Sequence, residues 1–68
     1  MSNMLKVIEV LAESEKSWED AARNAVNQAA ATVRNIKSIY IENFEAAVSD
    51  GKISSFRINA KITFLLEK

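Results

Sequence analysis

The chain contains neither cysteine nor histidine, so its fold can use no disulfide bridge and no imidazole metal site. It has 68 residues, and a domain of that size buries only about 60% of the surface its unfolded chain exposes, which leaves it marginally stable alone. Hydrophobic residues nevertheless make up 49% of the sequence, more than so small a domain can bury in its own core. We therefore expect residues 1–68 to form one domain that completes its core by associating with copies of itself.

Nine basic and nine acidic side chains cancel, so the chain has no net charge at pH 7. We therefore expect no nucleic acid and no membrane among its partners, because both bind small proteins mainly through an excess of positive charge. No segment approaches the apolar length of a membrane span, and the first residues lack the charged start and long apolar run of a signal peptide. These features predict a soluble, cytoplasmic protein.

The first half of the chain predicts a strand followed by a helix. Residues 4–12 form a run rich in β-branched side chains that is apolar on both faces, so we expect a helix on one face and a neighbouring subunit on the other. Ser17 followed by Asp20 resembles a capping box, which predicts the start of a helix. Apolar residues, mostly alanine, then recur at helical intervals as far as Ile36, with Lys37 near the last turn.

The second half predicts a hairpin. Residues 38–48 suit a strand whose alternation drifts over 43–46, as a bulge would cause. Asp50 followed by Gly51 is the strongest turn signal in the chain, and residues 53–67 then alternate between apolar and polar side chains. The expected fold is α+β, with a β-α-β-β order and a three-stranded antiparallel sheet wrapped around one helix.

Four segments of the chain carry a resemblance to a known family. They are Lys-Val-Ile-Glu-Val at 6–10, Ser-Glu-Lys-Ser-Trp-Glu-Asp-Ala-Ala at 14–22, Val-Arg-Asn-Ile at 33–36 and Phe-Arg-Ile-Asn-Ala-Lys-Ile-Thr-Phe at 56–64. Together they resemble the dodecin family, and the resemblance covers essentially the whole sequence. It implies a β-α-β-β subunit of a hollow homo-dodecamer, a non-enzymatic protein that binds, stores or sequesters a small ligand, commonly a flavin such as riboflavin or FMN held between symmetry-related subunits.

The residues that hold flavin in this family are replaced here. The resemblance implies that a Trp after the helix stacks on the isoalloxazine ring and that a Gln on the last strand bonds its polar edge, yet those positions are Ser38 and Arg57. Serine has no π-face and arginine no acceptor, so the chain is more similar to a Trp-lacking branch for which calcium is a candidate ligand. Tyr40 is a substitute aromatic if no bulge separates it from Ser38. The candidate ligand-binding residues are therefore Ser38, Tyr40 and Arg57.

Two side chains, Arg57 and Trp18, each allow two interpretations. Arg57 could face an acidic ligand, but we favour an ion pair across the hairpin with Glu42 or Glu45. Trp18 could stack on a ligand, but at the start of an alanine-rich helix we favour plain packing.

Glu42, Glu45 and Asp50 are oxygen donors of the kind that Ca²⁺ prefers, although they lack the spacing of an EF-hand loop. Copies of one carboxylate could converge on a symmetry axis, and the alternative is that all three are solvated surface groups.

We expect no enzyme. The sequence contains no His and no Cys, which are the commonest catalytic base and nucleophile near neutral pH, and it contains no glycine-rich phosphate loop. The leading hypothesis is a shell that binds a small ligand in a pocket at a subunit junction near the candidate residues. The alternatives are a structural or calcium-binding dodecamer without flavin, and a transient interaction module that acts as a dimer.

Overall fold

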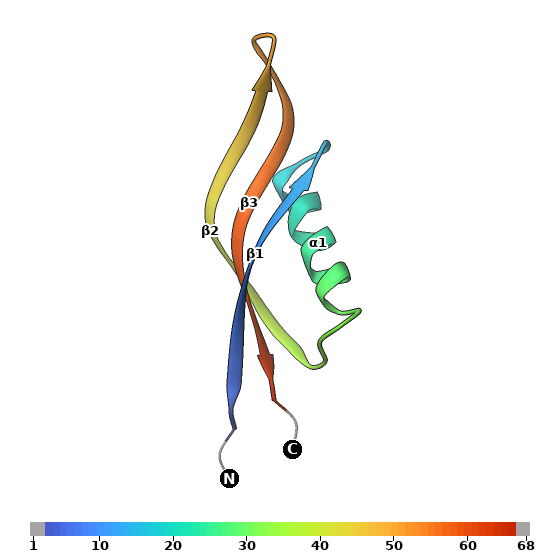
Figure 1. Cartoon of the computed structure of the whole chain (residues 1–68), viewed down its shortest axis with the longest axis vertical. Coiled ribbons are helices and arrows are strands. Elements are labelled where there is room, and N and C mark those ends of the chain that lie inside the picture. The colour runs from blue at the N-terminus through green and yellow to red at the C-terminus, as the bar shows by residue number, and fades with distance from the viewer. Residues whose placement is uncertain (1–2, 67–68) are drawn as a thin grey trace.

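The computed structural model describes residues 3–66 and confirms the order β-α-β-β (Figure 1). The three strands form one antiparallel sheet in the order β1-β3-β2, so the last strand lies in the centre. One helix packs against this sheet, as the sequence predicts. The elements are β1 (Leu5–Ser14), α1 (Trp18–Ala29), β2 (Ile36–Ser49) and β3 (Lys52–Leu65).

The start of the helix is fixed by two serine hydroxyls. Ser17 is the N-cap, and its Oγ accepts the backbone N–H of Asp20 at 2.9 Å, as the capping pattern predicts. The buried hydroxyl of Ser14, the last residue of β1, donates to Asp20 Oδ2 at 2.6 Å and accepts the backbone N–H of Lys16 at 2.9 Å. These bonds hold the tight connection through which the chain turns back from β1 into α1.

The helix ends earlier than the apolar periodicity predicts, at Ala29 rather than near Ile36. The backbone N–H of Thr32 bonds to Ala29 O at 3.0 Å, which closes a turn, and Asn35 then adopts a left-handed conformation with φ of 60°. β-branched residues are weak helix formers and asparagine tolerates that conformation better than most residues. Ile36 and Lys37 therefore begin β2 instead of ending the helix.

The core is a thin layer between α1 and the central strand. Small alanine side chains on the helix let its axis lie close to the isoleucine side chains of β3, as expected from the alanine-rich stripe. Within the described residues, the buried apolar side chains are Ala21, Ala25, Ile58, Ala60, Ile62 and Phe64. A core of this size leaves much apolar surface outside it.

Trp18 joins the helix start to the hairpin. Its ring lies edge-on to Phe56 and Phe44, with centroids 4.8 and 5.8 Å away, and its Nε1–H donates to the backbone oxygen of Glu45 at 3.0 Å. This confirms the packing role predicted for Trp18. The contacts of the indole therefore fix the position of the start of α1 along the hairpin.

The hairpin of β2 and β3 extends well beyond the rest of the molecule (Figure 1). Its turn has positive φ at Asp50 and Gly51, 51° and 75°, as the Asp-Gly signal predicts. The last residue of β1 pairs with Phe56, so β1 does not run beside residues 46–55 of the hairpin. These residues form a two-stranded arm without a third strand. We call this segment the arm.

The arm makes the subunit long and thin. Its extents are 54 × 20 × 13 Å and its radius of gyration is 14.0 Å, whereas a compact domain of this length has a radius of gyration of about 11 Å. The accessible surface is 5231 Å², against roughly 4,300 Å² from the scaling for a compact monomer of this mass. The chain is thus more extended than a compact domain of its length.

We predict that Ser17→Ala lowers the free energy of unfolding by about 1 kcal/mol, because the Asp20 N–H loses its acceptor at the helix start. Urea unfolding followed by far-UV circular dichroism at fixed protein concentration measures this loss. Ser49→Ala is the matched control, since Ser49 is exposed at the end of β2. An equal loss in both variants would contradict the capping role.

We also predict that Trp18→Ala lowers the free energy of unfolding by about 2 kcal/mol, because it removes a half-buried ring from two aromatic contacts. Trp18→Phe keeps a ring and loses only the exposed bond to Glu45 O, so its loss should stay below about 1 kcal/mol. Circular dichroism is the readout, because Trp18 is the only tryptophan and both variants lose its fluorescence signal. Equal losses would mean that the hydrogen bond, not the packing, positions α1.

Candidate functional site

Ser38 and Tyr40 lie side by side on the face of the sheet that points away from α1, which we call the outer face. Ser38 pairs with Thr63 and Tyr40 with Lys61 on β3. The register of β2 shifts between Ile36 and Ser38 and again after Ile41, so no bulge separates the two candidates and their side chains share one face. Tyr40 is 65% exposed, which leaves its ring available for contact.

Arg57 lies on the same face but not beside them. It pairs with Glu45 of β2 and Glu13 of β1, four residues along β3 from Lys61, the partner of Tyr40. At roughly 3.3 Å per residue this places Arg57 about 13 Å away along the strand. One chain therefore brings Ser38 and Tyr40 together but leaves Arg57 apart from them.

The Arg57 guanidinium is held by acidic groups of both neighbouring strands. Its Nη2 and Nε lie 2.6 and 2.8 Å from Glu13 Oε2, and its Nη1 lies 3.6 Å from Glu45 Oε1. The hydrogen bond to Glu13, followed by the charge of that carboxylate, raises the pKa of Arg57 above its ordinary value. The pair with Glu45 was predicted, while Glu13 was not, because the sequence does not fix the register of β1 against β3.

The three candidate metal ligands are separated along the hairpin. Glu42 lies 3.7 Å from Lys61 Nζ, Glu45 contacts Arg57, and Asp50 lies in the turn. Nowhere in the chain from residue 3 to residue 66 do three acidic side chains gather in a group able to hold a metal ion. A calcium site built from these residues would need carboxylates from more than one copy of the chain.

Asn59 occupies the centre of the outer face, between Leu11 and Asn43. Its Oδ1 is buried and has no hydrogen-bond partner within the described residues. The register shift between Ile41 and Asn43 lies next to it on β2. The sequence did not single out Asn59, because a polar residue at this position of the alternating strand has the same pattern as a solvated one.

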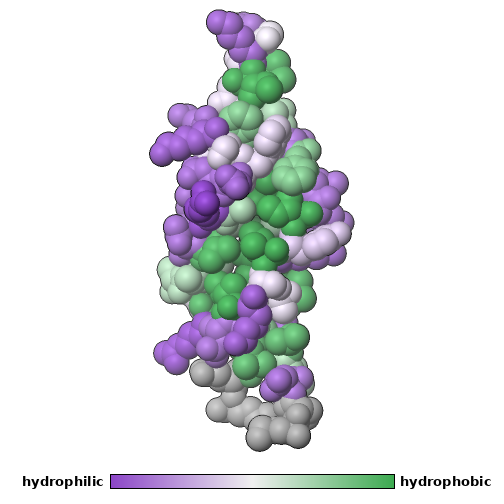
Figure 2. Space-filling view, turned by 180° about the vertical axis from the view of Figure 1, so that it is seen from behind, coloured by the Kyte–Doolittle hydropathy of each residue, from purple (hydrophilic) through white to green (hydrophobic). Residues whose placement is uncertain are grey.

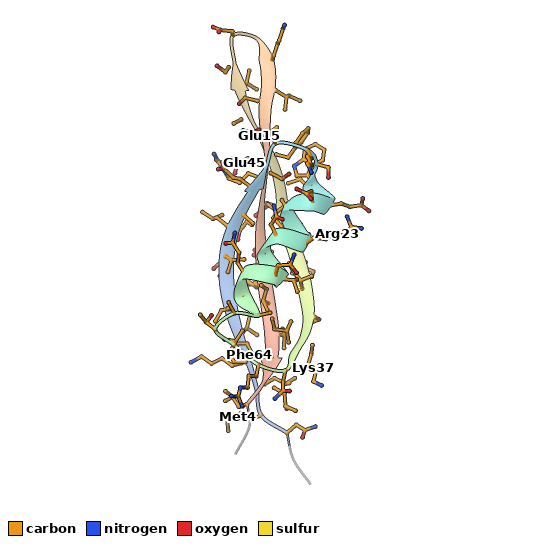
Figure 3. All side chains as sticks on the ribbon, turned by 90° about the vertical axis from the view of Figure 1, so that its right-hand side faces the viewer. Met4, Glu15, Arg23, Lys37, Glu45 and Phe64 are labelled. Atoms are coloured by element: carbon orange, nitrogen blue, oxygen red, sulfur yellow. The ribbon has the colours of Figure 1, made fainter. Side chains whose placement is uncertain are left out.

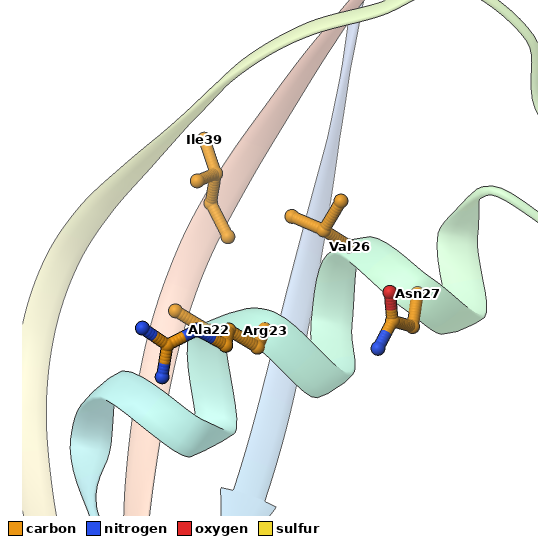
Figure 4. A pocket seen from close by; sticks show the side chains of 5 residues that line it. All are labelled: Ala22, Arg23, Val26, Asn27 and Ile39. Atoms are coloured by element: carbon orange, nitrogen blue, oxygen red, sulfur yellow. The ribbon is translucent and has the colours of Figure 1, made fainter.

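A cleft of about 290 Å³ opens on the other side of the sheet, between α1 and β2 (Figure 4). It exists because α1 packs mainly over β1 and β3 and makes fewer contacts with β2. Val26 of α1 and Ile39 of β2 point toward each other across it (Figure 4). Its lining residues are Ala22, Arg23, Val26, Asn27 and Ile39. The sequence gives no signal for this cleft, since the sideways position of a helix on a sheet depends on packing.

None of the helical structure within residues 3–66 reaches the length and apolar character needed to cross a membrane.

A model of the dodecin family matches residues 4–67. Among solved structures, dodecin from Streptomyces davaonensis superposes with a TM-score of 0.94 at 22% identity over 100% of both chains. Dodecin from Streptomyces coelicolor gives 0.93 at 27% identity over 97% of this chain and 94% of that one. The calcium dodecin from Mycobacterium tuberculosis, described as a calcium-chelating immunodominant antigen with a novel calcium-binding site, gives 0.82 at 34% identity over 94% and 91%. No curated protein matches.

The sheet, the single crossing helix and the long hairpin therefore agree with the family model, which spans nearly the whole sequence. These findings support a small-ligand-binding protein of the dodecin type, and the chain belongs to the dodecin family.

Proposed function

We propose that this chain is the subunit of a hollow homo-dodecamer that binds, stores or sequesters a small ligand in the cytoplasm and catalyses no reaction. The elongated shape supports assembly, because a radius of gyration of 14.0 Å and an uncovered arm leave apolar surface that a neighbour would bury. Membership of the dodecin family supports the small-ligand role.

The ligand site that we propose lies on the outer face at Ser38 and Tyr40 and is completed by a second copy. The observation that carries it is the 65% exposed Tyr40 ring beside the Ser38 hydroxyl, with no register shift between them. An exposed tyrosine offers a π-face together with a hydroxyl group. Thr63, opposite Ser38, adds a second hydroxyl at the same level of the sheet. Such a surface suits a flat heteroaromatic ring with polar edges.

A flavin, riboflavin or FMN, is the ligand that we propose for this surface. Tyr40 would stack on the isoalloxazine ring in place of the tryptophan that Ser38 replaces. Arg57 would reach the ligand only from a neighbouring copy, since within its own chain it lies about 13 Å along the strand and its donors engage Glu13 and Glu45.

Titration with riboflavin tests this site. We expect the purified protein to quench riboflavin fluorescence at micromolar concentration, and Tyr40→Ala to raise the Kd about tenfold, since aromatic contacts contribute about 1.5 kcal/mol beyond their buried area. Tyr40→Phe is the matched control, because it keeps the ring and should stay close to the unmodified chain. Absence of quenching would rule out flavin, and equal binding by Tyr40→Ala would place the flavin elsewhere.

A calcium-binding dodecameric assembly without flavin is the second candidate. The observation that favours it is the calcium dodecin of 34% identity. Glu42, Glu45 and Asp50 from more than one copy would then supply the oxygen ligands. Within one chain Glu42 and Glu45 already contact Lys61 and Arg57, so calcium would have to compete with these cations.

Thermal unfolding tests the calcium candidate. A site formed only in the folded assembly predicts that the melting temperature rises with Ca²⁺ and falls back with a chelator, because a ligand at one hundred times its Kd stabilises by about 2.7 kcal/mol. Glu42→Gln should remove that rise, and Mg²⁺ serves as the control ion. A melting temperature that is equal with Ca²⁺ and with chelator would contradict this function.

A further inference from the structure

The outer face of β1 is an apolar surface that no other part of residues 3–66 covers. Leu5, Val7 and Leu11 lie at alternate positions of the strand and so point to the same side. Their exposed fractions lie between 51% and 70%, although leucine and valine are among the residues most often buried. We call this surface, with Glu9 at its centre, the β1 face.

A second uncovered apolar surface runs along β2 on the helix side of the sheet. Viewed from behind, it forms a band of hydrophobic residues down the middle of the molecule, with hydrophilic residues on both sides (Figure 2). It begins in the cleft beside α1, passes Phe44, which is 64% exposed, and continues into the arm, where Val48 and Ile53 are 67% and 57% exposed. We call it the β2 stripe, and its residues are Ala22, Val26, Ile39, Phe44, Val48 and Ile53.

The excess accessible surface of the chain is comparable with the area that an interface with a second copy would bury. The accessible surface of 5231 Å² exceeds that of a compact monomer of this mass by roughly 900 Å². A standard protein interface buries about 800 Å² on each partner. If each copy takes part in two contacts, one through each surface, the excess corresponds to contacts of about half that size.

Each surface carries one charged side chain that has no ion-pair partner within residues 3–66. Glu9 is exposed between Val7 and Leu11, and Lys61, which lies opposite it, directs its Nζ to Glu42 at 3.7 Å. Arg23 is exposed at the cleft of the β2 stripe (Figure 3). The β1 face is thus apolar with an unpaired acid, and the β2 stripe is apolar with an unpaired base. Opposite charges on two apolar surfaces favour contact between them and fix its register.

We propose that the β1 face of one copy covers the β2 stripe of the next copy, with Glu9 facing Arg23. The two surfaces lie on opposite edges and opposite faces of the sheet, so this contact joins unlike surfaces and repeats from copy to copy, and it forms a closed ring where the rotation between copies closes. The proposal rests on the assembly put forward above and adds which surfaces meet in it.

Charge reversal tests the pairing. Glu9→Arg and Arg23→Glu each place like charges across every contact of this kind, and each should raise the concentration at which the assembly dissociates by about tenfold or more. The double variant Glu9→Arg/Arg23→Glu restores opposite charges and should return close to the unmodified value. Sedimentation velocity over a dilution series measures the dissociation, and far-UV circular dichroism follows the fold.

Glu15→Arg and Lys16→Glu are the matched controls, because they make the same charge changes in the exposed connection between β1 and α1, outside both surfaces. Both should assemble like the unmodified chain. The difference between the single and double variants should shrink at 1 M salt, where the screening length falls to about 3 Å.

The pairing is overturned if the single reversals leave dissociation unchanged, or if the double variant dissociates more readily than either single one. Should a single variant fail to fold, recovery of the fold and of the assembly in the double variant still decides the question. An unmodified chain that sediments as one subunit would instead overturn the assembly itself, so the two failures are distinguishable.

Discussion

The close contact between the alanine side of α1 and the isoleucines of β3 is the interaction on which the rest of the subunit depends. Ala21 on the helix and Ile58, Ala60 and Ile62 on the strand are fully shielded from solvent, and only small side chains let the two backbones approach so closely. Because this layer is thin, the helix covers the sheet incompletely. The cleft beside β2 and the bare arm follow from that incomplete cover, and both leave apolar side chains exposed.

The sequence predicts those elements whose signals are local. The capping serine, the Asp-Gly turn and the alternation of β3 each depend on a few neighbouring residues, and all three appear as expected. The helical spacing overstates the length of α1, because Val33 and Ile36 continue that spacing while the left-handed Asn35 reverses the chain. The Glu13 contact of Arg57 and the cleft were missed for another reason: each depends on how distant segments lie against one another.

The outer face divides into two regions of different character. Around Arg57, acids of both flanking strands satisfy the guanidinium and tie the three strands together, although ion pairs this exposed contribute little to stability. Around Tyr40 the ring and the neighbouring hydroxyls remain open. Arg57 is thus engaged within its own chain, whereas Ser38 and Tyr40 are exposed. One fold can carry sites of different chemistry.

The register shifts of β2 have a consequence for how the chain avoids wrong association. β2 is an edge strand of 14 residues, and a long, regular edge with free N–H and C=O groups is a template for sheet extension and aggregation. Two irregularities, at 36–38 and 41–43, each insert an extra residue into β2 and interrupt that row, whereas the shift at 47–48 comes from an extra residue on β3. The irregular edge therefore makes β2 a poorer template for the addition of a foreign strand.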